Sequence, residues 1–141
     1  MPTRFLRPLL AIAIFLLSFS VATGPAWAAV TDWQKGGSIS PASSSDFASA
    51  SFQQSLRNLA AIHANYVTLI IPYHQSNIWS TDIQPGWDTP TDASLIAAIH
   101  SAHLLGLHVM LKPHIDPYDG QWRANINPSD RNGWFANYDK M

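Results

Sequence analysis

The chain contains no cysteine and no glutamate, and each absence limits its chemistry. Without cysteine there is no disulfide framework and no thiolate nucleophile. All nine acidic residues among the 141 are aspartates, so no mechanism that requires a glutamate can be completed by this polypeptide. The lack of disulfides is compatible with export, because an exported domain can be stabilised by a hydrophobic core instead.

Charged residues are also scarce, at 12% of the chain, and the formal net charge is −1. A mildly acidic domain has no basic surface with which to hold phosphates, so we expect neither nucleic acid nor anionic lipid as a partner. The sequence has no glycine-rich phosphate loop and no Gly-x-Ser-x-Gly elbow. We therefore expect no nucleotide chemistry, and we expect no cofactor.

The amino-terminal segment has the organisation of a secretory signal peptide. Arg4 and Arg7 form a short basic region, an apolar run follows over Leu9–Phe19, and Ala26–Ala28 supplies the small-x-small pattern of a cleavage site. We predict a signal peptide over residues 1–29.

Cleavage would leave a mature domain over residues 30–141, secreted or periplasmic and with no membrane association. The alternative is an uncleaved segment that anchors the protein in the envelope. It stays open because apolar residues extend from Phe5 to Ala22, which approaches the length that spans a membrane.

Strand and helix patterns alternate along the mature chain. The expected strands are Gly36–Ser40, Tyr66–Ile71 (ended by Pro72) and Leu107–Leu111, and a long loop is expected over 73–88. The expected helices begin near Ser51, at a cap on Thr89, and at a cap on Ser129 or Asp130, and Gly106 is expected to end the second. The predicted inner faces are Phe52, Leu56, Leu59, Ala60 and His63 for the first helix, and Leu95, Ile96, Ile99, His103 and Leu104 for the second.

The β-α-β-α-β order predicts a parallel sheet with right-handed crossovers. A complete (β/α)₈ barrel takes about 250 residues, and one βα unit takes roughly 30. The predicted fold class is therefore α/β, a partial (β/α)₈ TIM barrel that comprises the first three or so βα units. A small, self-sufficient three-strand α/β domain is the alternative.

Polar and aromatic side chains gather directly after the third predicted strand, whose Val109–Leu111 segment has the pattern of a buried strand. The cluster consists of Lys112, His114, Asp116, Tyr118, Asp119, Trp122 and Arg123. Parallel α/β folds bind ligands at the carboxyl ends of their strands. An indole packs on the C–H face of a sugar ring, and a guanidinium fork bonds oxygen atoms with defined geometry. The cluster predicts a ligand site suited to sugars.

Catalytic and metal-binding groups are harder to find. Asp116 and Asp119 are the carboxylates close enough in sequence to form the pair that glycoside hydrolysis requires. Their Asp-Pro-Tyr-Asp-Gly sequence favours a turn, and we interpret it as one. His100 and His103 lie three apart, and no histidine spacing matches a metal motif, so we expect no metal.

Several segments together resemble a known family. They are Thr89–Asp92, Gly106–His114, Asp119–Arg123 and Trp134–Phe135 before Tyr138. From about Lys35 onward the chain resembles the amino-terminal part of glycoside hydrolase family 113, β-mannanase-like TIM barrels in the clan of retaining β-glycosidases.

The resemblance implies a mechanism with two glutamates, an acid/base after the fourth strand and a nucleophile after a later one. It carries over His114, Asp116, Trp122 and Arg123 as residues that contact the sugar or shape its site, and no catalytic residue. We therefore expect the amino-terminal portion of a secreted hydrolase of β-linked polysaccharide, mannan or a related glycan, inactive alone. The expected partner is a polysaccharide or oligosaccharide, and the oligomeric state stays open. The alternatives are a non-catalytic carbohydrate-binding protein and an envelope-anchored protein.

Overall fold

The structure, a computed structural model, describes residues 33–141 and has the predicted alternation of strands and helices. The elements in chain order are β1 (Gly36–Ile39), η1 (Asp46–Ala48), α2 (Ala50–Ala61), β2 (Tyr66–Gln75), α3 (Asp92–Leu104), β3 (His108–Pro117), η2 (Arg123–Asn125) and α4 (Arg131–Tyr138). The predicted signal peptide at residues 1–29 lies outside the described residues.

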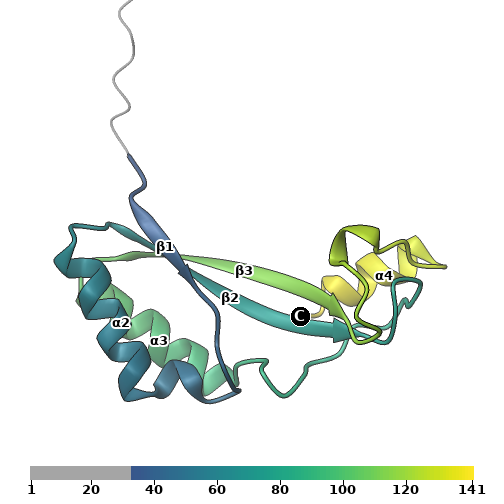
Figure 1. The fold of residues 1–141 in the computed structure, drawn as a ribbon, viewed down its shortest axis with the longest axis horizontal. Coiled ribbons are helices and arrows are strands. Elements are labelled where there is room, and N and C mark those ends of the chain that lie inside the picture. Colours follow the sequence, from purple (N-terminus) through teal and green to yellow (C-terminus); the bar gives the residue numbers. More distant parts are fainter. Residues whose placement is uncertain (1–32) are drawn as a thin grey trace, which may run out of the picture. The chain divides into compact units, whose positions relative to one another are not determined.

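The three strands form one parallel sheet in the order β1-β2-β3 (Figure 1). β2 and β3 pair along their whole length, from Tyr66↔His108 to Gln75↔Pro117. β1 pairs only with the first part of β2, as far as Ile39↔Leu69. Helical crossovers between parallel neighbours confirm the predicted α/β class.

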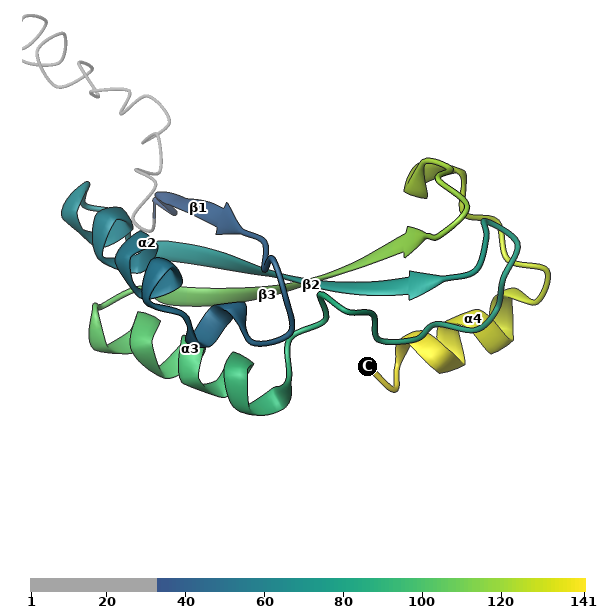
Figure 2. The ribbon, with the colours of Figure 1, turned by 60° about the horizontal axis from the view of Figure 1, so that its bottom comes forward.

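The hydrophobic core lies between the sheet and the two helices α2 and α3, which run along the amino-terminal halves of β2 and β3 (Figure 2). Side chains alternate between the two faces of a strand, so odd-numbered residues of β2 such as Val67 and Leu69 face the helices. The core residues are Phe47, Phe52, Leu56, Val67, Leu69, Ala98, Ala102 and Leu107.

Helix α2 begins and ends where local chemistry favours it. The Ser49 side chain caps the helix by accepting a hydrogen bond from the Phe52 N–H at 3.1 Å. After the helix ends at Ala61, His63 adopts a φ of 60° and is exposed. Its predicted place on the inner face is wrong because the helix ends two residues before it.

Helix α3 is capped by Thr91, whose hydroxyl accepts from the Ser94 N–H at 3.2 Å, so the predicted cap at Thr89 is wrong. The Thr89 hydroxyl instead donates to the Pro72 carbonyl at 2.6 Å and accepts from the Gly86 N–H at 2.7 Å. It ties the loop after β2 to the strand.

The buried face of α3 consists of the small residues Ser94, Ala98 and Ala102, with Leu95 and Ile99 partly buried. Ile96, His103 and Leu104, predicted to face inward, are exposed. Small side chains let the helix backbone approach η1, α2 and β3 closely, and this selects the alanine face over the bulkier one. The predicted end of the helix is confirmed, since Gly106 has a φ of 76°.

Strand β2 continues through Pro72, which was predicted to end it. The N–H groups of Tyr66 and His74 donate to Lys35 and Gln84, on the edge of β2 away from β3. The two-residue period of a strand points the Pro72 nitrogen to that same edge. Because β1 has already ended at Ile39, the missing N–H breaks no bond between strands.

The same reasoning accounts for the prolines of β3. The N–H groups of His108 and Tyr118 donate to the carbonyls of Asn65, directly before β2, and Gln75, its last residue. Pro113 and Pro117, of opposite parity, direct their nitrogens to the other edge, where residues 33–141 supply no partner strand.

This open edge also corrects the prediction of a buried third strand. Met110 and Leu111 are 48% and 45% exposed.

Two leucines, one buried and one exposed, test the packing of this core. Leu56→Ala, at a position with 0% exposure, is expected to lower the free energy of unfolding by about 2–5 kcal/mol, because it removes buried methyl groups and leaves a cavity. Leu104→Ala, at 81% exposure, is expected to change it by less than about 0.5 kcal/mol. Urea denaturation of the 141-residue chain measures both. A larger cost at Leu104 than at Leu56 would contradict this packing.

Candidate functional site

The candidate site lies at the carboxyl end of β2 and β3, on the sheet face opposite the helices. His114 and Asp116 were predicted to follow the third strand, but β3 extends to Pro117 and carries both residues. Even-numbered side chains of β3 share one face. The register puts His74 of β2 directly beside Asp116 on this face.

Arg123 joins the two β3 side chains from η2. Its Nη2 lies 2.9 Å from Asp116 Oδ1 and 3.1 Å from Asp116 Oδ2. Its Nη1 contacts the Nδ1 atom of His114. The structure therefore brings three of the four predicted site residues together.

The electrostatics of the cluster favour a neutral imidazole. The pKa of His114 lies below its ordinary value, first because of partial burial and then because of the positive charges of Arg123 and Lys112, with Asp116 acting in the opposite direction. A neutral His114 can accept a hydrogen bond from Arg123 at Nδ1, which an imidazolium could not do. The cluster thus presents a fixed guanidinium, a carboxylate and a neutral imidazole.

Trp122 stands apart from this cluster. It is 71% exposed, and its indole makes no hydrogen bond or ring contact within the described residues. Exposure of this kind leaves a large apolar surface available to a ligand.

The turn after β3 has the conformation that its sequence predicts. Asp119 Oδ1 accepts from the Gln121 N–H at 3.0 Å, and Gly120 has a φ of 76°. An aspartate engaged in its own turn is the structure expected for Asp-Pro-Tyr-Asp-Gly.

A second group on the same face was missed by the sequence analysis. His74, only 8% exposed, holds Asp88 Oδ1 at 2.7 Å through Nε2. Tyr118 stacks on the His74 ring with 4.5 Å between centroids and 7° between planes. The prediction that β2 ends at Pro72 concealed this group, because it placed His74 in a loop.

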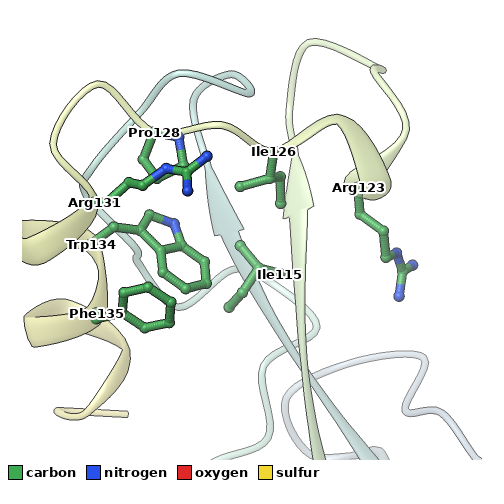
Figure 3. A pocket seen from close by; sticks show the side chains of 7 residues that line it. All are labelled: Ile115, Arg123, Ile126, Pro128, Arg131, Trp134 and Phe135. Carbon is green, nitrogen blue, oxygen red and sulfur yellow. The ribbon is translucent and has the colours of Figure 1, made fainter.

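A cavity of about 410 Å³ lies between the carboxyl end of β3 and α4, and Arg123 of the cluster is part of its lining. Its lining consists of Ile115, Arg123, Ile126, Pro128, Arg131, Trp134 and Phe135. Figure 3 shows Trp134 and Phe135 on one side of β3 and the guanidinium of Arg123 on the other. The Trp134 indole is fixed because its Nε1 donates to Gln75 Oε1 at 2.9 Å.

Within residues 33–141, no three side chains of the metal-binding types converge on one point. The helices in that part of the chain are too short or too polar to cross a membrane.

Comparison with known proteins gives one consistent family. The sequence profile of Glycoside Hydrolase Family 113 matches residues 40–141. No curated protein sequence matches the chain.

Solved structures described as family 113 enzymes are also similar to the chain. A β-1,4-mannanase has 27% identity and a TM-score of 0.70, and a complex of a β-1,4-mannanase has 28% and 0.68. The β-mannanase from Alicyclobacillus acidocaldarius in complex with ManMIm has 25% and 0.66. Each alignment covers 76% of this chain but only 37–38% of the solved one.

The Arg123–His114 contact predicts a change in titration. In Arg123→Gln the pKa of His114 is expected to rise, because a positive charge and the donor that favours the neutral ring are both removed. Proton NMR of the imidazole against pH measures it. Arg131→Gln, which removes a cation whose side chain bonds the Asn127 amide instead, is the matched control and is expected to leave this pKa unchanged. A fall in the Arg123 variant would contradict the assignment.

Proposed function

Because this chain belongs to glycoside hydrolase family 113, we propose that it forms the amino-terminal portion of a hydrolase of β-linked polysaccharide, mannan or a related glycan. In this proposal the chain contributes part of the glycan-binding surface and does not cleave the glycan by itself. The observation that carries the proposal is the Arg123–Asp116–His114 cluster at the carboxyl end of the strands.

The fold is consistent with such a role. The chain is a partial (β/α)₈ barrel, similar over 76% of its length to 38% of a β-1,4-mannanase. Barrels of this kind carry their active sites at the carboxyl ends of the strands. The cluster occupies that position.

Each group of the cluster has a chemical task in sugar recognition. Asp116 can accept a hydrogen bond from a sugar hydroxyl while Arg123 holds it in place. The neutral imidazole of His114 keeps Nε2 for a second hydroxyl, because Nδ1 faces Arg123. Trp122 offers its exposed indole to the C–H face of a ring.

Hydrolysis requires two further groups. Glycosidases use an acid and a second carboxylate that flank the scissile bond. Here Asp116 is paired with Arg123, Asp88 bonds His74, and Asp119 accepts from its own turn. With no glutamate in the chain, these engaged aspartates support binding without cleavage.

We propose further that the chain is exported, with residues 1–29 as the signal. The basic start and the Ala26–Ala28 site support this location.

Replacement of Arg123 tests the binding role. Arg123→Lys keeps the charge but loses the planar fork that holds Asp116. A hydrogen bond to a charged group contributes roughly 1.5–3 kcal/mol, so affinity for mannotetraose is expected to fall by about tenfold or more. Isothermal titration of the 141-residue chain measures it, with cellotetraose in parallel to rank the glycans.

Arg57→Lys is the matched control, since its guanidinium bonds the Gln54 side chain on α2 and is not part of the cluster. Its affinity is expected to equal that of the parent chain. Release of reducing ends from mannan by the purified chain would overturn the non-catalytic part of the proposal. Absence of any heat signal from the folded parent chain would overturn the binding part.

Export is tested by sequencing the amino terminus of material secreted from an expressing cell. The mature chain is expected to begin at Ala29 or Val30, because signal peptidase cuts after a small-x-small site. Intact Met1 in the membrane fraction would support the envelope anchor instead.

A further inference from the structure

We propose that Tyr118 is a stacking platform for one sugar ring of the bound glycan, and that His74 and Asp88 are positioning residues for it. This inference rests on the proposed function and adds a subsite to it. The site is built from three segments: β2, the loop before α3, and the residue directly after β3.

Tyr118 has one ring face covered by a neighbouring ring, and the residue as a whole is largely exposed. Its ring stacks on His74 at 4.5 Å and 7°, so the covered face lies flat against an imidazole. The residue is nevertheless 59% exposed. An aromatic ring that is supported on one face can pack its other face against the C–H face of a pyranose.

The supporting ring is fixed in turn. His74 is 8% exposed, and its Nε2 lies 2.7 Å from Asp88 Oδ1. Its backbone N–H donates to the Gln84 carbonyl at 2.8 Å and its carbonyl accepts from the Gln84 N–H at 2.8 Å. Held at side chain and backbone, His74 determines where the Tyr118 ring can lie.

Gly86 lies against the edges of the stacked His74 and Tyr118 rings. A Cβ atom at this position would lie 2.2 Å from His74 Cδ2 and 2.9 Å from the Tyr118 hydroxyl. The loop therefore passes so close to both rings that any larger residue would displace one of them. This contact makes the platform a built site instead of a chance stacking of surface rings.

The platform lies beside the proposed glycan contacts. His74 is the register partner of Asp116, and the Tyr118 N–H donates to the Gln75 carbonyl at 2.9 Å, which continues the pairing of β2 with β3. Tyr118 and the Arg123–Asp116 pair thus share one end of one sheet face. A glycan bound by the guanidinium cluster has an aromatic surface next to it.

The test is an NMR titration of the 141-residue chain with mannotetraose. An aromatic ring stacked on a sugar shifts the sugar C–H protons upfield, and removing such a contact is expected to weaken binding by about tenfold. Tyr118→Ala is expected to lose both the upfield shift and the affinity, and Tyr118→Phe to keep both. Tyr138→Ala is the matched control, because Tyr138 also stacks on another ring, that of Trp134, which lies on the opposite side of β3 from the guanidinium of Arg123.

Positioning is tested at Asp88. Asp88→Asn keeps an oxygen that can accept from His74 and is expected to keep the upfield shift. Asp88→Ala frees the imidazole and is expected to reduce the shift, with backbone amide spectra confirming that the fold is intact.

Each result decides between the two proposals. Parent-like affinity in Tyr118→Ala, with affinity lost in Arg123→Lys, would overturn the platform and leave the proposed function standing. No binding by the parent chain would overturn the proposed function itself. An equal upfield shift in Asp88→Ala and in the parent chain would remove His74 and Asp88 from the proposal.

Discussion

The parallel register of β2 with β3 is the constraint on which the other features depend. It runs unbroken from Tyr66↔His108 to Gln75↔Pro117. A slip of one residue would turn every side chain of β3 to the opposite face. Val109 would then leave the helices, and Asp116 would lose its place beside His74. The same pairing therefore stabilises the core and assembles the polar cluster.

The sheet has an apolar face and a polar face, and the side chain of Arg123 contacts groups on both. Apolar residues such as Leu69 face α2 and α3, while His114 and Asp116 point to the opposite face. Arg123 borders the apolar cavity and also holds the polar pair. Because the guanidinium contacts both His114 and Asp116, it is held in place as a hydrogen-bond donor on the polar face.

Periodicity and turn chemistry in the sequence were sufficient to predict the order of elements, the end of α3 at Gly106 and a cap of α4 at Ser129 or Asp130, of which the structure has Asp130. The errors came where tertiary context overrides local rules. A proline is disfavoured inside a strand, but the nitrogen of Pro72 faces an edge of β2 that β1 no longer pairs with. The larger side chains of α3 suggested an inner face, yet close packing selected Ala98 and its neighbours. The cluster around His114 was predictable because its members are close in sequence. The His74–Asp88–Tyr118 group was not, since a loop separates them.

The prolines at the outer edge of β3 govern how that edge can associate. Pro113 and Pro117 have no N–H, so a strand that paired with this edge of β3 would lack hydrogen-bond donors at these two positions. Identical chains stacking edge to edge would inherit the same gaps at each junction, which disfavours growth of a cross-β filament from this surface. Lys112, between Met110 and His114 on the same strand, adds charge repulsion between such copies.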